Sequence, residues 1–320
     1  MGAAIAALAA NVGLSVDLLD IVPPGAQGKD RNAIVNAGFE RMLKAKPPAL
    51  VDARLVENIR LGNFEDDFER LKEADWVLEV IIEKLEAKQE LMARLEQVVK
   101  ENAILSSNTS GIPLSKIAAG CSERFRRRFL GTHFFNPPRY LKLLEIIPTG
   151  DTDPQVVEDM RTFGERVLGK GVVITKDTPN FIGNRIGSYS GMQAMKYALQ
   201  NGYGIEEVDA LMGPLIGRPN TALFRLADQV GLDIRAAVAK NLYAMIPEDQ
   251  FRQDLISPEP IERMLQANLL GNKTGSGFYK RTQRDGQTVF DVINLQTLDY
   301  QPAQHPETEL CHAITFSARP

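Results

Sequence analysis

His133 is the residue whose surroundings most clearly suggest chemistry. It lies in Gly131-Thr-His-Phe-Phe-Asn-Pro-Pro138, and Glu145 lies in a second apolar run, Leu143-Leu-Glu-Ile-Ile147. If the two runs pair as a hairpin centred on residue 139, the imidazole and the carboxylate stand opposite each other. A carboxylate beside an imidazole fixes the ring tautomer and raises its basicity, which suits a general base for an alcohol proton. The alternative is a structural hydrogen bond within a core.

Two further segments combine hydroxyl, amide and charged side chains. Ser106-Ser-Asn-Thr-Ser110 follows an expected strand, and ligands of parallel sheets bind at the ends of strands. The same residue types also serve as helix caps and turns. Residues 176–185 read Lys-Asp-Thr-Pro-Asn-Phe-Ile-Gly-Asn-Arg, at the point where expected strands give way to helices. Sites favour such boundaries, although Asn184 alone could be a helix residue that bonds locally.

The amino-terminal segment contains part of a dinucleotide-binding pattern. Gly2 opens a helix of small residues, and Asp20 follows 18 residues later at the end of an expected strand. In the full pattern, two earlier glycines and a first strand bring the pyrophosphate to the helix N-terminus. That upstream half is missing here, so a plain Ala/Gly helix followed by an ordinary acid is the alternative.

These residues need a scaffold, and the hydrophobic pattern predicts one. Strands and helices are expected to alternate up to residue 175: helix 2–11, strand 15–22, a polar excursion 23–73, strand 76–82, helix 85–100, and strand 103–106, then strands 129–134 and 141–147, helix 154–168 and strand 171–175. This alternation predicts an α/β fold. After residue 180 helical periodicity dominates, in 183–201, 205–212, 222–245 and 258–268. We therefore expect a Rossmann-type dinucleotide-binding domain without its first strand over 1–177, an all-α domain over 178–281 and a patternless tail over 282–320.

Composition excludes several functional classes. The 320 residues are 44% hydrophobic and 24% charged, with 37 basic and 41 acidic side chains. This balance predicts a globular protein without a nucleic-acid partner. No apolar run approaches the ~18 residues of a membrane span, and no basic segment precedes the first apolar run as in a signal peptide. Cys121 and Cys311 lie far apart, so neither a disulfide framework nor a metal site is expected, and a cytoplasmic location fits best.

Taken together, the segments resemble the 3-hydroxyacyl-CoA dehydrogenases of fatty-acid β-oxidation. The resemblance covers about residues 1–281 and is carried by residues 79–83 (Glu-Val-Ile-Ile-Glu), 106–110, 131–137, 143–145, 176–185 and 273–279 (Lys-Thr-Gly-Ser-Gly-Phe-Tyr). Residues 109–112 and 213–219 are similar to bacterial forms in which an enoyl-CoA hydratase domain follows. A hydratase domain or partner is therefore expected, together with a homodimer formed through the helical domain.

The resemblance implies oxidation of (S)-3-hydroxyacyl-CoA to 3-oxoacyl-CoA with NAD as cofactor. His133 would be the general base and Glu145 its orienting partner. The remaining catalytic residues would be Ser110 and Asn184, which hydrogen-bond the substrate oxygen, and Asn136, which supports the pair. The cofactor-binding residues would be Asp20 at the ribose, Gly2 near the pyrophosphate, Glu83 and Lys88 at the border of the cleft, and Ser110 and Asn136.

Two other functions remain open. One is a different two-domain hydroxyacid dehydrogenase, in which Lys196 would be the acid and free hydroxy acids the substrates. The other is a truncated, non-catalytic remnant that acts by association. The second is suggested by the missing first strand, because its absence would leave the neighbouring strands with unpaired edges.

Overall fold

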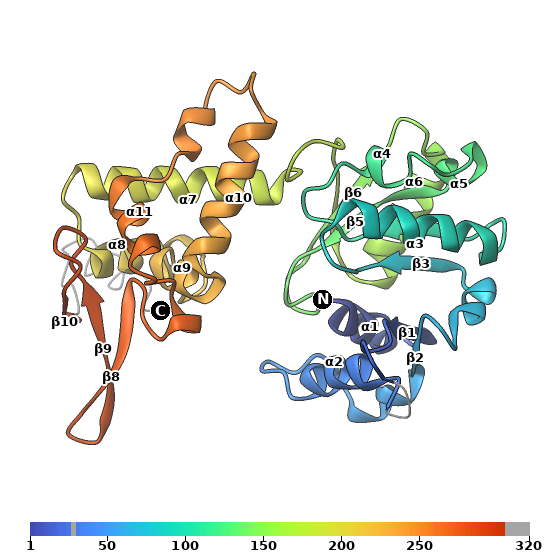
Figure 1. The fold of residues 1–320 in the computed structure, drawn as a ribbon, viewed down its shortest axis with the longest axis horizontal. Coiled ribbons are helices and arrows are strands. Elements are labelled where there is room, and N and C mark those ends of the chain that lie inside the picture. The colour runs from blue at the N-terminus through green and yellow to red at the C-terminus, as the bar shows by residue number, and fades with distance from the viewer. Residues whose placement is uncertain (27–29, 305–320) are drawn as a thin grey trace, which may run out of the picture. The chain divides into compact units, whose positions relative to one another are not determined.

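The computed structural model describes residues 1–26 and 30–304. The chain divides into two compact units, the first from Met1 to Ile182 and the second from Gly183 onward (Figure 1). This division lies close to the boundary expected at residue 177. Cys311 and residues 305–320 of the expected tail lie outside the described residues.

A five-stranded sheet forms the larger part of the first unit. Its strands, in spatial order, are β3 (Trp76–Glu79), β4 (Ile104–Ser107), β5 (Phe129–Phe134), β6 (Leu143–Pro148) and β7 (Gly171–Ile174). All neighbouring strands are parallel except β5 and β6, which form an antiparallel hairpin. The alternating strands and helices of the sequence therefore produce the predicted α/β fold.

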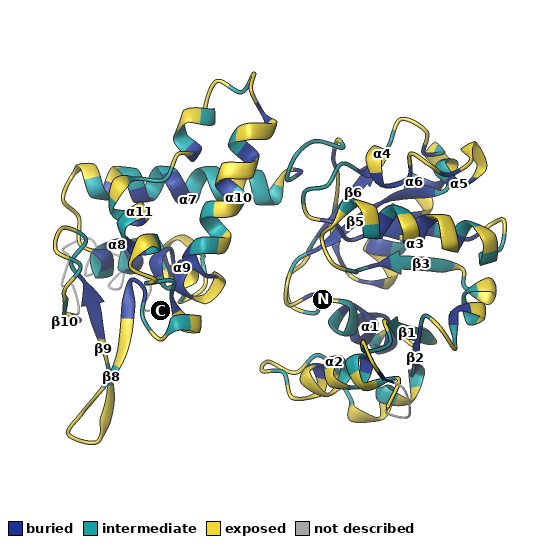
Figure 2. Cartoon of the chain, viewed as in Figure 1, coloured by how far each residue is buried: buried dark blue, intermediate teal, exposed yellow. Residues whose placement is uncertain are grey.

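Helices cover both faces of this sheet. They are α1 (Gly2–Asn11), α3 (Leu85–Val98), α4 (Leu114–Ile117), α5 (Glu123–Arg127) and α6 (Pro154–Thr162), the last continued by a π-helical turn at Phe163–Val167. Consecutive strand residues point to opposite faces. Phe129 packs with α3, α4 and α5, while Leu130 packs with α1 and α6. Both side chains are fully buried, so the sheet is a packed base for the residues at its ends. Figure 2 shows buried stretches along the strands and helices of this unit.

A separate two-stranded sheet completes the first unit. β1 (Val16–Asp20) pairs in parallel with β2 (Ile59–Asn63), and α2 (Ala33–Leu43) packs near them. The sequence predicted α1 and β1 but missed β2, which was expected to belong to the polar excursion over 23–73. Short 3-10 helices at Ala53–Asn58 and Phe68–Glu73 flank β2.

Helix α1 connects the two sheets. Ile5 and Leu8 pack with the five-stranded sheet, whereas Ala6, Ala7 and Ala10 pack with the two-stranded one. Among the described residues β1 pairs only with β2, and β3 pairs only with β4. β1 and β3 therefore each have a strand neighbour on one side among the described residues.

The second unit is helical, as predicted. Its helices are α7 (Gly183–Gln200), α8 (Ile205–Leu211), α9 (Phe224–Val230), α10 (Leu232–Met245) and α11 (Glu259–Gln266), with 3-10 helices at Pro214–Ile216, Arg252–Leu255 and Asn272–Thr274. The predicted helix 222–245 is divided at Gly231, whose φ of +99° breaks the helix.

The expectation of a patternless tail is wrong for residues 282–304. These residues contribute to an antiparallel sheet of β8 (Tyr279–Arg284), β9 (Gln287–Ile293) and β10 (Tyr300–Pro302). Val292 and Ile293 pack against the helical core, while most of β8 is exposed. Few apolar positions are therefore needed to hold this sheet, so its sequence carries little hydrophobic signal.

Candidate active site

The β5–β6 hairpin brings His133 and Glu145 together. Its register pairs the two residues directly, as the sequence predicted. The Nδ1 atom of His133 lies 2.7 Å from Oε2 of Glu145, and the two residues are 3% and 0% exposed. The second carboxylate oxygen of Glu145 accepts a hydrogen bond from the amide of Ile182 at 2.9 Å. The imidazole is therefore held from one side by a buried carboxylate.

The other ring nitrogen of His133 faces a hydroxyl. Ser110 Oγ lies 3.2 Å from Nε2 of His133. Because the Glu145 carboxylate can only accept, Nδ1 carries the proton when the ring is neutral and Nε2 becomes the acceptor. The rings of Phe135 and Phe181 pack against the imidazole at centroid distances of 4.6 and 5.6 Å. The site can thus accept a proton at one defined atom.

A single carboxylate clamps the turn that carries Ser110. Oε1 of Glu83 accepts hydrogen bonds from the Thr109 hydroxyl at 2.5 Å, the Ser110 amide at 2.9 Å and the Gly111 amide at 3.3 Å. Burial opposes the ionisation of Glu83. The hydrogen bond from Thr109 and the nearby Lys88 ammonium outweigh that effect, so the pKa of Glu83 lies below its usual value. Glu83 is therefore a charged clamp at neutral pH.

Lys88 and a residue that the sequence analysis did not select lie behind this clamp. Lys88 is 1% exposed, and its Nζ contacts Oε1 of Glu79 at 2.7 Å and Oε2 of Glu83 at 3.2 Å. Glu79 ends β3 and is 3% exposed. A carboxylate in an apolar strand was the signal that drew attention to Glu145, and the same signal could have identified Glu79.

Two of the residues expected at the cofactor, Gly2 and Asp20, lie at the start of α1 and at the end of β1. A Cβ atom on Gly2 would lie 3.8 Å from Val80 and 3.9 Å from Leu18, which places the start of α1 beside β1 and the residue that follows β3. Asp20 is the last residue of β1, partly exposed, and its Oδ1 accepts a hydrogen bond from the Ile21 amide.

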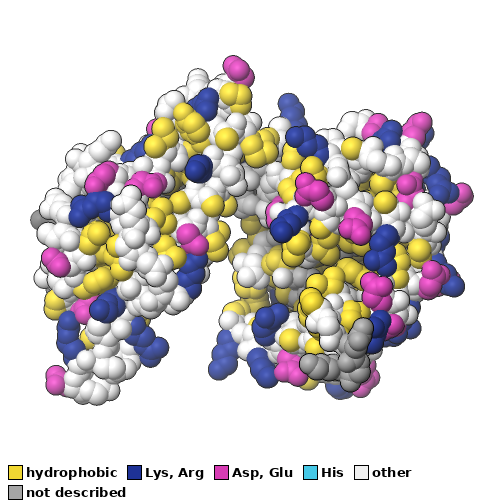
Figure 3. Space-filling model, in the orientation of Figure 1, with side chains coloured by type: hydrophobic (Ala, Val, Ile, Leu, Met, Phe, Trp, Pro, Cys, Tyr) yellow, Lys and Arg dark blue, Asp and Glu magenta, His cyan; other side chains and the backbone are white. Residues whose placement is uncertain are grey.

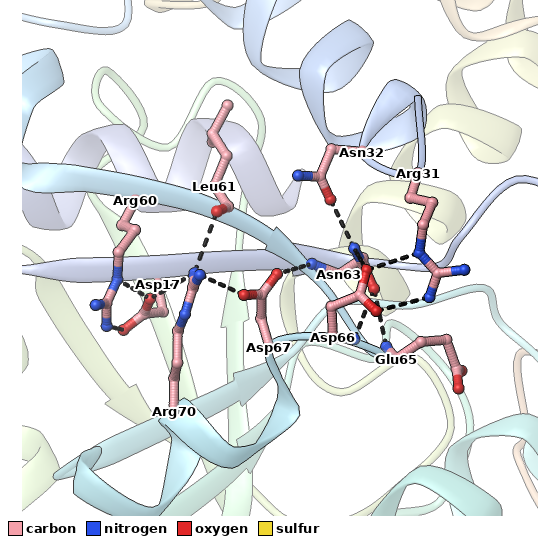
Figure 4. A network of polar contacts seen from close by, with 10 residues as sticks. All are labelled: Asp17, Arg31, Asn32, Arg60, Leu61, Asn63, Glu65, Asp66, Asp67 and Arg70. Atoms are coloured by element: carbon pink, nitrogen blue, oxygen red, sulfur yellow. Dashed lines mark hydrogen bonds and ion pairs between the residues drawn. The ribbon is translucent and has the colours of Figure 1, made fainter. Parts of the chain in front are cut away.

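A polar network supports the end of the two-stranded sheet (Figure 4). Asn63 is 2% exposed and donates from its amide group to Asn32 and Asp66, while Asp66 forms a two-pronged ion pair with Arg31. Next to it, the Phe64 amide donates to the carbonyl oxygen of Asp20 at 3.0 Å. The network links α2, β2 and the turn after β2, and it fixes the strand end that carries Asp20.

The remaining predicted residues lie on other elements. Asn136 is exposed in the turn after β5, and Asn184 lies in the first turn of α7, in the second unit. Lys196 donates a hydrogen bond to the carbonyl oxygen of Gln253 at 2.9 Å. Among residues 1–26 and 30–304 there is no group of three or more His, Cys, Asp or Glu arranged to hold a metal ion. In the same part of the chain, no helix is long and apolar enough to span a membrane.

Comparison with known proteins finds related chains. Residues 1–178 match the family model "3-hydroxyacyl-CoA dehydrogenase, NAD binding domain", and residues 181–281 match the corresponding C-terminal domain. A Deinococcus radiodurans protein named "Probable 3-hydroxyacyl-CoA dehydrogenase" is 52% identical over 283 residues, covering 88% of this chain and 80% of the relative. A Bacillus subtilis protein of the same name is 46% identical over 94% of this chain, which spans 39% of that relative. The crystal structure of (S)-3-hydroxybutyryl-CoA dehydrogenase from Ralstonia eutropha has a TM-score of 0.69 at 30% identity, covering 87% of this chain and 94% of the other.

Proposed function

We propose, since the chain belongs to the 3-hydroxyacyl-CoA dehydrogenase family, that it oxidises (S)-3-hydroxyacyl-CoA to 3-oxoacyl-CoA with His133 as the general base. The family is one of NAD-dependent oxidoreductases. The observation that carries the proposal is the contact between His133 Nδ1 and Glu145 Oε2 at 2.7 Å, with Nε2 turned to Ser110. Fatty-acid oxidation is the metabolic setting that we propose.

The residues of this chain would move one proton and hold one oxygen. The substrate hydroxyl donates its proton to Nε2 of His133 as the C3–O bond becomes a carbonyl. Glu145 keeps the ring in the tautomer that can accept this proton and stabilises the imidazolium that results. Ser110, held by Glu83, donates a hydrogen bond to the oxygen that becomes the carbonyl. The chemistry that bound NAD would supply is a hydride acceptor for C3.

The residues at the ends of α1 and β1 suit the adenosine half of NAD. The start of α1 offers amide N–H groups and the positive end of a helix dipole to the pyrophosphate. Asp20 offers carboxylate oxygens to the ribose hydroxyls from the carboxyl end of β1. The predicted roles of Asn136 and Asn184 stay predictions, which alanine variants at these positions can test through the KM for each substrate.

The experiment that tests the proposal is an absorbance assay of NADH consumption with acetoacetyl-CoA. We expect the chain to reduce this thioester and His133→Gln to lower kcat by roughly 10²–10⁴, the usual contribution of a general base. Glu158→Gln is the matched control, because Glu158 forms an exposed ion pair with Arg161 on α6. Full turnover in His133→Gln would show that His133 is not the base, and activity on free hydroxy acids alone would show that the substrate class is different.

We also propose a homodimer formed through the second unit. Apolar side chains are exposed on its helices, with Ile186 and Tyr197 of α7 each 61% exposed and Ile234 of α10 49% exposed. Figure 3 shows hydrophobic side chains on the visible face of this unit. Sedimentation equilibrium should give twice the chain mass, and Ile186→Glu should lower the association constant. We also propose the enoyl-CoA hydratase partner that the resemblance of residues 109–112 and 213–219 implies, which substrate channelling assays with a separate hydratase can test.

A further inference from the structure

A buried ion pair lies directly behind the turn that carries Ser110. The side chains of Glu79 and Lys88 are 0% and 1% exposed, and Lys88 Nζ lies 2.7 Å from Oε1 of Glu79. Burying two charges is costly unless their other atoms are also hydrogen-bonded. Oε1 of Glu79 also accepts from the Ile81 amide at 2.7 Å, and Oε2 accepts from the Ser107 hydroxyl. Both oxygens of Glu79 are therefore committed to named partners.

Two chains of contacts lead from this pair to the Ser110 turn. In the first, Lys88 reaches Glu83, and Glu83 accepts hydrogen bonds from the amides of Ser110 and the next residue. In the second, the Ser107 hydroxyl bonded to Glu79 accepts from the Thr109 amide at 3.1 Å. Because both series of contacts end on the consecutive residues 109–111 of one turn, they fix the position of the turn from two directions.

The turn needs such support because it is exposed on one side. Ser110 lies at the surface, whereas Thr109 is 1% exposed. The contact between Ser110 Oγ and His133 Nε2 is 3.2 Å long, at the outer limit of hydrogen-bond reach for a catalytic pair. A displacement of about 1 Å would remove it, and displacements of that size can lower rates about 10²-fold.

We propose that Glu79 is a positioning residue for the dehydrogenase reaction, acting through Lys88, Glu83 and Ser107 on the placement of Ser110. The proposal rests on the proposed function, because it concerns the oxygen that His133 and Ser110 share. Glu79 itself does not touch the reacting atoms. It holds the carboxyl end of β3 to the turn after β4, so that the hydroxyl and the imidazole meet at one point.

The first test is Glu79→Gln. The amide keeps the size of the side chain but removes one of the two carboxylates that contact Lys88. Its NH2 group also replaces an oxygen that accepts from the Ile81 amide or the Ser107 hydroxyl, so two donors face each other. We expect kcat to fall about 10–100-fold while both KM values stay within about twofold. Asp75→Asn is the matched control, since Asp75 precedes the same strand and forms an exposed ion pair with Lys100. An unchanged kcat in a folded Glu79→Gln protein would overturn the proposal.

A second set of variants separates positioning from folding. Glu79→Leu with Lys88→Met replaces the buried pair by apolar side chains, a change that often preserves stability. We expect the double variant to remain folded, with a melting temperature lowered by the loss of the acceptor of the Ile81 amide and the Ser107 hydroxyl. It should still show a low kcat, because Glu83 has lost its ammonium partner. In a Ser110→Ala background, Glu79→Gln should cause no further loss of kcat. Full kcat in the double variant, or independent losses in the Ser110→Ala background, would contradict the proposal.

A spectroscopic readout keeps the test independent of the proposed function. The Nε2 resonance of His133, assigned by its loss in His133→Gln, should shift in the same direction in Glu79→Gln and in Ser110→Ala. Asp75→Asn should leave it in place. If the chain were inactive but these shifts occurred, the proposed function would fail while the positioning role would hold. If the resonance moved only in Ser110→Ala, Glu79 would not position Ser110.

Discussion

Both units bury carboxylates, and two of those in the second unit, Asp209 and Asp228, have different partners from Glu145 and Glu79 in the first. In the first unit, Glu145 faces His133 and Glu79 faces Lys88, so each contacts a side chain that can carry charge. In the second unit, Asp209 accepts hydrogen bonds from the amides of residues 223–225. Glu145 and Glu79 act on the candidate site through an imidazole and an ammonium group, whereas a carboxylate bound mainly to amides joins elements of the fold.

Asp228 is the clearest example of a buried carboxylate that joins elements of the fold. It accepts the amides of Phe278 and Tyr279 at 2.8 Å each, and so connects α9 to the start of β8. Burial raises the pKa of Asp228 to about 6, although the two amide bonds oppose that shift. The Tyr279 hydroxyl also donates to Asp209 at 2.9 Å. Neither aspartate was selected from the sequence, because a structural acid and a catalytic one look alike before their partners are known.

The largest effect should come from Glu145→Gln. The glutamine oxygen is needed by the Ile182 amide, which leaves its NH2 group facing Nδ1 of His133. The ring would then carry its proton on Nε2 and could not accept the substrate proton. We expect kcat to fall by about 10²–10⁴, as for other triads with the wrong tautomer. Steady-state assays with acetoacetyl-CoA check this, and retention of more than a tenth of kcat would contradict the assigned tautomer.

Asp209→Ala should act on stability instead. It removes the acceptor of three amides at the start of α9 and of the Tyr279 hydroxyl. We expect the free energy of unfolding in urea to fall by about 2–4 kcal/mol, because buried donors are left unsatisfied. Glu207→Ala in the same helix α8 is the control and should change it by less than about 0.5 kcal/mol. Equal urea midpoints for Asp209→Ala and the parent chain would refute the structural role.

The raised pKa of Asp228 predicts a pH dependence of stability. Because its pKa rises from 3.8 to about 6 on folding, the folded chain binds this proton more tightly than the unfolded chain. The stabilisation is complete below about pH 4 and is lost as the pH rises through 6, by at most about 3 kcal/mol. The unfolding free energy of the parent chain minus that of Asp228→Asn should therefore be larger at about pH 4 than at about pH 7.5, because only the parent chain loses stability as Asp228 ionises. A difference independent of pH would show that Asp228 does not titrate in this range.

The sequence predicted the elements whose pattern is strong. The register of His133 and Glu145 followed from two apolar runs placed symmetrically about a Pro-Pro turn, because antiparallel neighbours must then face each other. The helices of the second unit followed from their periodicity. The predicted α1 and β1 were likewise confirmed, since small residues and a short apolar run are both local signals.

Other features depend on contacts that no local pattern records. β2 has only two apolar side chains, Ile59 and Leu61, within a polar region, and these pack with residues of α1 and β1. β8 to β10 bury one face against the helices, so most of their residues remain polar. The contacts from Glu79 through Lys88 to Glu83 join a strand, a helix and a loop, and only the folded chain brings them together.

The smallest predicted effect concerns Asp20, whose carboxylate is not buried like those of the other acids compared above. It is partly exposed, and the side-chain contact described for it is with the neighbouring Ile21 amide. We expect Asp20→Ala to raise the KM for NAD about tenfold, the value of one or two hydrogen bonds to a charged acceptor, with kcat unchanged. Asp17→Ala is the control on the same strand, because Asp17 is paired with Arg60 at 2.6 Å. If the two variants raised the KM equally, the effect would come from the two-stranded sheet as a whole, and Asp20 would have no specific role at the ribose.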